Sequence, residues 1–280
     1  MRSSICLCIA SLLLPAVLPA CGGDPDPTGD PQGSTGGGGN GSTGESESSG
    51  GKLSLVINYL GTPIGGLTVE ITTNDCSGTV LDSAVTDGNG RVAFSGLEAS
   101  DVAAHVVAAK GVAGSDWVDT WTYDVKVDKP ESPTESVNVL QVGTLPTVEG
   151  SAGDYTPDPS MGAVIGATYL GDANRPQDRD YLGCMRIVLS EDPENDSVRY
   201  AGPEGLPSDA SAQPETRNET GRFYIGNVAP GAYTLKAVSR DGSELASAKV
   251  CVRPRDPVRG TIALVGVYVP ETAQLGECPY

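Results

Sequence analysis

From Gly51 onward, apolar side chains recur at every second position, and this alternation limits the possible fold more than any other feature of the sequence. In "LTVEITTN", Leu67, Val69 and Ile71 alternate with polar residues. A period of two is that of a β-strand with one buried face, whereas an α-helix needs a period near 3.6. The chain also has 37 glycines and 21 prolines, which supply turns between short strands. The sequence therefore predicts an all-β fold.

The stretch "TDGNGRVAFSGL" allows two interpretations. Asp87 and Asn89 stand where a calcium loop of the form D-x-N-x-[DN]-G begins, but Arg91 takes its fifth position and no glutamate follows at its twelfth. Asp and Asn beside glycine also suit a tight turn, because both tolerate a positive φ. We favour a β-hairpin, with Val92 and Phe94 on one face of its second strand. Asp87 and Asn89 remain weak candidates for calcium.

A similar unit occurs in each half of the chain. A turn ends in Gly-Arg, and apolar residues follow at the second and fourth positions after the glycine: Val92 and Phe94 in one copy, Phe223 and Ile225 in the other. The second copy, "GRFYIGNVAPGAYTLKA", resembles the carboxypeptidase regulatory-like domain, with its Gly-x-aromatic and Pro-Gly-x-Tyr-x-Leu pattern. The first copy lacks the proline-glycine-tyrosine return. The resemblance implies a transthyretin-like β-sandwich.

We therefore expect two tandem transthyretin-like or Ig-like β-sandwiches, at residues 51–145 and 146–280. Each segment is within the usual size range for one hydrophobic core. In zinc carboxypeptidases this β-domain carries neither metal ligands nor a catalytic acid. The resemblance therefore implies a protein that is not an enzyme and needs no cofactor.

The first residues read as a targeting segment. Arg2 precedes an apolar run that is shorter than the roughly 20 residues needed to span a bilayer, so residues 1–20 are predicted to be a signal peptide. Its end, "LPAC", resembles the lipobox of bacterial lipoproteins, which implies cleavage before Cys21 and acylation, such as palmitate, at that cysteine. The alternative is ordinary secretory cleavage after Ala20, with Cys21 an incidental thiol.

Residues 21–50 are rich in Gly, Ser, Thr, Pro and acid and contain no large apolar side chain. Such a segment cannot bury a core, so we expect a disordered tether. Its composition resembles the lipoprotein linkers of myxobacteria. We expect an exported protein held on a membrane by its lipid. Gly22 after the lipidated cysteine favours the outer membrane, on its periplasmic face or the cell surface.

The charge balance limits the partners. The chain has 36 acidic against 18 basic residues, a net charge of −18. Such a balance argues against binding nucleic acid or anionic lipid headgroups through charge. The expected partners are the membrane, through the lipid, and an envelope or extracellular protein or glycan.

Four of the seven cysteines lie beyond the leader and the lipidated position: Cys76, Cys184, Cys251 and Cys278. Outside the cytoplasm they can pair in three ways. Since only Cys76 lies in the first half, complete pairing requires one bond between the halves. Otherwise one bond forms within the second half and two thiols stay free. No Cys/His spacing suggests zinc.

Other candidate site residues are few. His105 is the single histidine, so a hydroxyl–histidine–acid site would have to form around it, and we expect it instead on the outer face of a strand. One segment places five residues on a common face: Trp117, Trp121, Tyr123, Val125 and Val127. Its aromatic rings are either a platform for stacking a sugar or part of a core or domain contact.

The sequence thus favours a lipid-anchored cell-envelope protein with a non-catalytic structural, protein-interaction or adhesion role. The alternative is a surface module that binds carbohydrate or calcium. Exposure of Trp117 and Trp121 on a flat face would favour this alternative, and burial of both indoles would contradict it.

Overall fold

The computed structural model describes residues 50–107, 117–127, 135–153, 156–171, 180–191, 197–208, 214–273 and 278. The predicted signal peptide at residues 1–20, the acylation of Cys21 and the tether up to residue 49 lie outside these residues and stay predictions. Within the described residues, no helix is long and apolar enough to cross a membrane.

Strands dominate the described chain, which confirms the all-β prediction. The first half forms eight strands: β1 (Gly51–Tyr59), β2 (Thr62–Pro63), β3 (Thr68–Thr73), β4 (Val80–Val85), β5 (Arg91–Leu97), β6 (Asp101–Val107), β7 (Asp119–Lys126) and β8 (Glu135–Asn138). The second half forms one helix and eight strands: α1 (Leu145–Ser151), β9 (Gly162–Leu170), β10 (Asp180–Tyr181), β11 (Arg186–Leu189), β12 (Val198–Tyr200), β13 (Arg222–Val228), β14 (Gly231–Val238), β15 (Glu244–Val252) and β16 (Thr261–Val269).

The two halves repeat one two-sheet frame. In the first half β1 pairs with β5 antiparallel and β8 parallel, while β3, β6 and β7 form an antiparallel sheet. In the second half β9 pairs in the same way with β13 and β16, and β11, β14 and β15 form the antiparallel sheet. The repeated Gly-Arg units of the sequence therefore begin equivalent strands, β5 and β13.

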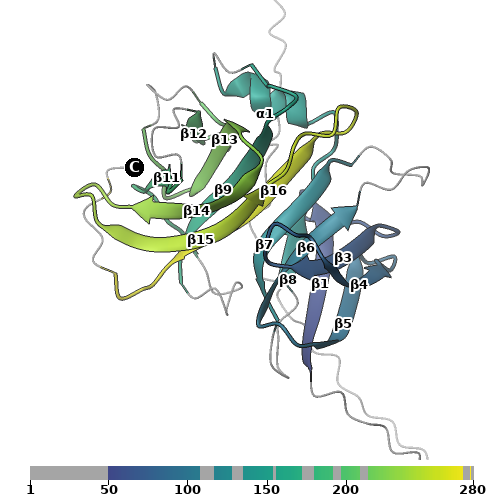
Figure 1. Cartoon of the computed structure of the whole chain (residues 1–280). Coiled ribbons are helices and arrows are strands. Elements are labelled where there is room, and N and C mark those ends of the chain that lie inside the picture. The colour runs from purple at the N-terminus through teal and green to yellow at the C-terminus, as the bar shows by residue number, and fades with distance from the viewer. Residues whose placement is uncertain are drawn as a thin grey trace, which may run out of the picture.

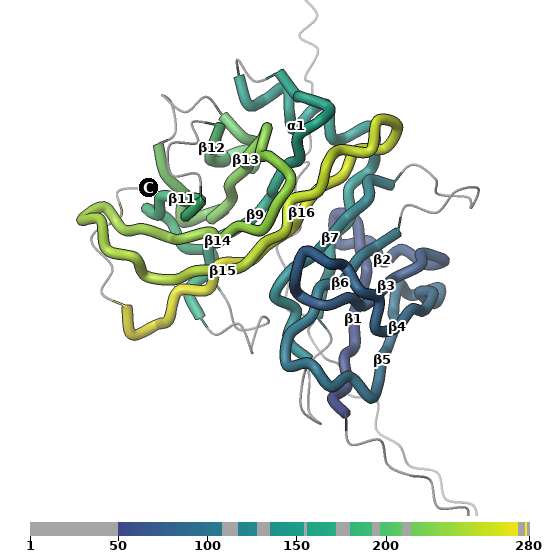
Figure 2. Tube along the Cα trace, in the orientation of Figure 1, coloured from purple at the N-terminus to yellow at the C-terminus, as the bar shows by residue number. Residues whose placement is uncertain are grey.

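The halves are joined by a shared sheet. β16 pairs with β7 in parallel, which places the strands in the order β12-β13-β9-β16-β7-β6-β3-β4, with β10 beside β9 as the ninth. We call the β7–β16 pairing the seam. Figure 1 shows the two halves on either side of it, and the trace in Figure 2 follows the same course.

The covering sheets of the two halves lie on opposite faces of this shared sheet. Consecutive residues of β6 show this, since Ala103 packs into the core of the second half and Ala104 into that of the first. The sheet of β1, β5 and β8 covers the first half on one face, and the sheet of β11, β14 and β15 covers the second half on the other. The fold is thus two sandwiches that share one wide sheet.

Helix α1 was not predicted from the sequence, because two helical turns are too short to show a 3.6-residue stripe. Pro146 occupies its first turn, where a missing N–H costs nothing. Leu145 and Val148 pack on the second-half sheet beside Ile262. The buried carboxylate of Glu149 pairs with Arg255, so the helix is fixed by an ion pair as well as by apolar contact.

The shared face predicted for five residues, Trp117, Trp121, Tyr123, Val125 and Val127, is not formed. A β-bulge interrupts β7, where Asp124 adopts a positive φ of 59° and the register with β6 shifts. Because one extra residue reverses the side-chain alternation, Trp121 and Tyr123 face the core of the second half and Val125 faces that of the first.

Both disulfides form. Cys76 pairs with Cys251 and Cys184 with Cys278, with Cα–Cα distances of 5.3 and 5.6 Å. The first is the bond between halves that complete pairing required. It ties the β3–β4 loop to β15 across the seam.

Candidate functional site

Because each covering sheet extends over only its own half, each face of the shared sheet has an uncovered part beside the seam. On one face a polar and aromatic cluster fills this part. On the other face the uncovered part is a groove. The filled part leaves no space for a ligand, whereas the groove is partly open to solvent.

The filled side centres on His105 in β6. Its Nδ1 lies 3.1 Å from Glu70 Oε2 and its Nε2 lies 2.7 Å from Asp119 Oδ1. The imidazole stacks on Trp121 with ring centroids 3.8 Å apart, and the guanidinium of Arg253 lies 3.8 Å from the same indole. The residues come from β3, β6, β7 and the segment after β15, so the cluster joins the two halves.

This geometry does not support a hydroxyl–histidine–acid site. Both ring nitrogens of His105 already face carboxylates, so neither remains to activate a hydroxyl. Trp121 Nε1 donates to the second oxygen of Asp119 at 3.3 Å. Beside it, burial raises the pKa of Tyr123, against the opposing charge of Arg253. The cluster therefore stabilises the contact between the two halves beside the seam.

The bulge at Asp124 strengthens the same contact. Its Oδ1 accepts from Asn74 Nδ2 at 2.6 Å and its Oδ2 accepts from the backbone N–H of Lys249 at 3.0 Å. Asn74 Nδ2 also donates to Asp101, whose pKa is lowered by hydrogen bonds from Asn74 and Ser100. The carboxylate of Asp124 thus connects the first half to the edge of β15.

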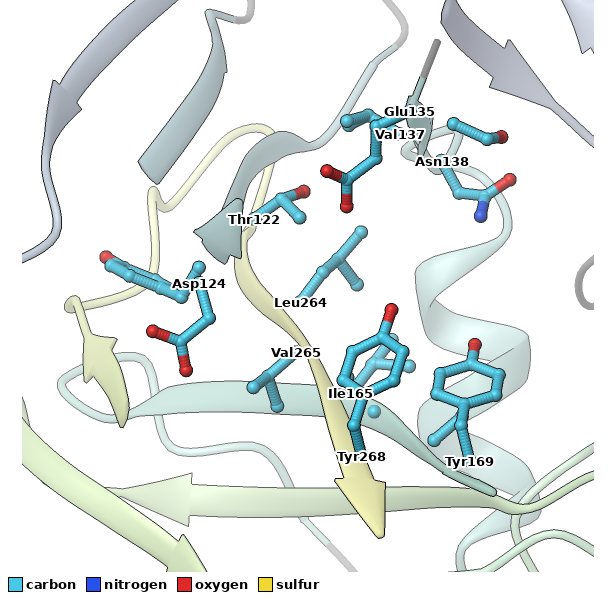
Figure 3. A pocket seen from close by; sticks show the side chains of 15 residues that line it. Thr122, Asp124, Glu135, Val137, Asn138, Ile165, Tyr169, Leu264, Val265 and Tyr268 are labelled. Atoms are coloured by element: carbon cyan, nitrogen blue, oxygen red, sulfur yellow. The ribbon is translucent and has the colours of Figure 1, made fainter. Parts of the chain in front are cut away.

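The open side is a groove of about 660 Å³, partly open to solvent. It lies between β8 and the exposed face of β7, β16 and β9 (Figure 3). Ile165 and Leu264 lie in its floor, and four consecutive residues of β8, 135–138, form one wall. An apolar hollow of about 370 Å³ continues past Leu264 toward Tyr59.

Three half-buried tyrosines stand in a row across the end of this face. Tyr181, Tyr169 and Tyr268 occupy paired positions on β10, β9 and β16. Tyr169 stacks with Tyr181 at 5.3 Å and with Tyr268 at 5.2 Å between ring centroids. Figure 3 shows the hydroxyls of Tyr169 and Tyr268 directed toward the β8 side of the groove. The row gives the groove an aromatic wall.

Polar atoms converge on the apolar floor. Glu135, Asn138 and Thr122 line the groove together with the two tyrosines. Thr122 Oγ1 and Asn138 Oδ1 are buried and have no hydrogen-bond partner among the residues that the structure describes. An unsatisfied buried polar atom costs roughly 1–3 kcal/mol, so a hydrogen-bonding ligand that reaches them would recover free energy.

The candidate sugar platform at Trp117, Trp121 and Tyr123 is not formed. The indoles are only 8% and 7% exposed, and Tyr123 is 4% exposed. Trp117 packs edge-on against Tyr59 in the first core, whereas Trp121 packs in the second. The three rings are core and seam residues, as the second interpretation of the segment proposed.

Asp87 and Asn89 form a turn. The Oδ1 of Asp87 accepts from the backbone N–H groups of Asn89 and Arg91, both at 2.8 Å, and Gly90 has a φ of 70°. Val92 and Phe94 are both buried in the strand that follows. In the described part of the chain, no three His, Cys, Asp or Glu side chains are placed to hold a metal ion.

Sequence reasoning missed the tyrosines, although a local signal exists. Tyr169 and Tyr268 each follow a small residue on the same strand face, Ala167 and Gly266 respectively. A small neighbour two positions away leaves space beside an aromatic ring. The sequence could not show that the two rings are in contact. β9 and β16 are about 100 residues apart in the sequence, and their pairing is a tertiary contact.

A second exposed feature is the free edge of the shared sheet. Among the described strands, β4 pairs only with β3, and it carries Val80, Leu81 and Val85, which are 50%, 43% and 60% exposed. These are three of the five large apolar side chains exposed in the described chain, beside Leu60 and Val258. In the second half the corresponding strand, β12, pairs with β13 in the other sheet of the frame.

Comparison with known proteins identifies no family. No family model matches the chain, and no curated protein matches it. Among solved structures it is similar to the Bacillus anthracis TIE protein, at 10% identity and a TM-score of 0.26 over 79% of this chain. It spans only 34% of that protein's length.

Two pilins give similar values. The shaft pilin SpaA from Lactobacillus rhamnosus GG matches at 10% identity and a TM-score of 0.24, over 81% of this chain and 100% of the pilin. GBS52, the minor pilin of Streptococcus agalactiae, matches at 12% identity and a TM-score of 0.26, over 82% and 99%. Scores this low carry no functional argument, and the fold is established by the strand pairing described above.

Proposed function

We propose that this chain is an exported, lipid-anchored cell-envelope protein with a non-catalytic, protein-interaction role. The lipobox-like "LPAC" before Gly22 and the acidic tether support anchoring through Cys21. Two disulfides support an oxidising compartment. The relationship to carboxypeptidase regulatory-like domains belongs to the same proposal and is supported by the repeated frame of the halves.

The observation that carries the interaction role is the edge strand β4. Thr86, just after β4, donates to Leu67 O and accepts from the N–H of Gly66. By the alternation of an antiparallel pair, Ser83 and Val85 direct their backbone groups away from β3. Asp82 Oδ1 accepts from the N–H of Ser83 at 2.8 Å, so this backbone N–H already has an acceptor. The side chains along the edge are otherwise largely apolar.

An exposed apolar edge is a template for another strand, and natural proteins usually shield it. When a partner adds a strand to such an edge, backbone hydrogen bonds provide affinity and pockets for alternate side chains provide specificity. The occupant we propose is an extended segment of another envelope protein, neutral or basic because this chain carries a net charge of −18.

Photo-crosslinking in the producing cells tests this. A photoreactive amino acid at position 83 should give one defined adduct with an envelope protein, and the double variant Leu81→Lys/Val85→Lys should abolish it. The matched control is the same probe at Val258, which is 79% exposed away from β4. Equal adducts from both positions, or only adducts between copies of this chain, would overturn strand addition.

Anchoring is tested separately. Cells supplied with an alkyne fatty acid should label the wild-type chain and release Cys21→Ser unlabelled from the membrane fraction. Labelling that persists in Cys21→Ser would place the lipid elsewhere, and a soluble, unlabelled wild-type chain would favour ordinary secretory cleavage after Ala20.

A further inference from the structure

We infer that the groove between β8 and the seam is a binding site for a neutral carbohydrate. This site goes beyond the proposed protein-interaction role and uses different residues, because β4 lies at the far edge of the shared sheet. The inference rests on the shape of the groove, its aromatic wall and its buried polar atoms.

The groove is partly open to solvent and continues into a smaller apolar hollow. The two spaces share Asn138, Ile165 and Leu264. A ligand of one to a few sugar rings could therefore continue from one into the other.

The lining is amphipathic in the way that a sugar ring is. A pyranose has an apolar C–H face and an edge of hydroxyls. Leu264, Ile165 and the ring of Tyr268 offer apolar surface, and aromatic rings favour stacked contacts. The hydroxyl edge would meet Thr122 and Asn138, whose buried oxygens have no partner in the described part of the chain. A hydroxyl both donates and accepts, so it suits these acceptors.

The charges of the groove argue against other ligand classes. None of the 15 described residues that line it is Lys, Arg or His, which disfavours phosphate, uronic acids and nucleic acid. Of its two carboxylates, Asp124 is already held by Asn74 and by the backbone of Lys249. A strand of peptide would have only the four residues of β8 to pair with. A neutral sugar fits best.

The test uses the full-length chain, exported and solubilised in detergent, on an array of neutral and acidic glycans. The neutral oligosaccharide that binds best is then titrated by calorimetry against wild type and variants. Tyr268→Ala should weaken binding by up to about tenfold, the equivalent of one good stacking contact. Thr122→Val, which removes one hydroxyl at constant shape, should weaken it several-fold.

The matched control is Tyr233→Ala, a tyrosine on β14 in the covering sheet of the second half. It should bind like wild type, as should Leu81→Lys/Val85→Lys, so that failure of this site and of strand addition stay distinguishable. Thermal unfolding shows whether Tyr268→Ala is folded, and Thr122→Val gives the answer if it is not. No neutral glycan bound, unchanged affinity in the groove variants, or a basic peptide bound in place of sugar would each overturn the assignment.

Discussion

Beside the seam, each face of the shared sheet has a part that no covering sheet reaches. Side chains fill this part on one face, and on the other face it is a groove. On one face, His105, Trp121 and Arg253 pack together and bridge the halves. On the other, Tyr169 and Tyr268 line a groove that is partly open to solvent, and the ring of Tyr268 lies over Gly266. Aromatic side chains occupy both faces, but only the tyrosines line a space that a ligand could enter.

This difference separates the side chains that hold the halves together from those that line the groove. Trp121 is stacked and hydrogen-bonded by residues from several strands, whereas Tyr268 is half-buried at the edge of a hollow. Substitutions on the closed face should therefore change stability, and those on the open face should change binding.

The largest effect is expected for Trp121→Ala. Removing the indole leaves a cavity in the second-half core and removes the stacking partner of His105, so unfolding should be easier by about 3–5 kcal/mol. Chemical denaturation followed by circular dichroism measures this. Tyr268→Ala, on the open face, should lose less than about 1 kcal/mol. Equal losses in the two variants would refute the distinction between the faces.

The disulfide between the halves should rank next. Replacing Cys76 and Cys251 with serine frees a loop of 175 residues and should cost about 2–5 kcal/mol. Because, of the two disulfides described, this one alone joins the halves, its loss should also separate the unfolding of the halves into two steps. The control pair, Cys184→Ser/Cys278→Ser, should keep one transition, as measured by calorimetry. Two steps in both variants would argue against a role specific to the seam.

A pair of glycine substitutions compares the two faces directly. A Cβ on Gly166 would lie 2.2 Å from the buried ring of Phe223, whereas one on Gly266 would lie 2.8 Å from the ring edge of half-buried Tyr268. Gly166→Ala should therefore cost about 1–3 kcal/mol by overpacking. Gly266→Ala should displace Tyr268 with little loss of stability and weaken glycan binding. The reverse ranking in thermal unfolding would show that the groove side is the more tightly packed.

A small effect is expected away from both faces, at the turn of Asp87. Asp87→Ala removes the acceptor of two backbone N–H groups and should cost about 1 kcal/mol. The thermal midpoint of the wild type should be the same with and without calcium. A midpoint that rises with calcium in the wild type but not in Asp87→Ala would restore the calcium interpretation.

Much of the fold could be predicted because its signals are local. The alternation in "LTVEITTN" and "GRFYI" and the Asp-Gly-Asn turn gave strands and a hairpin where the structure has them. The errors had specific causes. The bulge at Asp124 reversed the alternation in β7, and no local feature marked it. Helix α1 was too short to show a period, and its buried Glu149 is paired with a residue 106 positions away.

The candidate site was less predictable than the fold. The sequence drew attention to tryptophans, because they are large and alternate with valines, but their environment depends on what covers them. The tyrosines of the groove each occurred singly in an apolar strand. Only the parallel pairing of β9 and β16 brought Tyr169 and Tyr268 together.

The sequence by itself determined the strands, the turns, the repeated unit and the requirement that complete cysteine pairing cross between the halves. These follow from side-chain periodicity and from covalent order, which are properties of neighbouring residues. Tertiary structure alone decided that Cys76 pairs with Cys251, that the halves share a sheet, and which part of each face stays uncovered. Those outcomes depend on contacts between distant segments, and β7 against β16 joins residues about 140 positions apart.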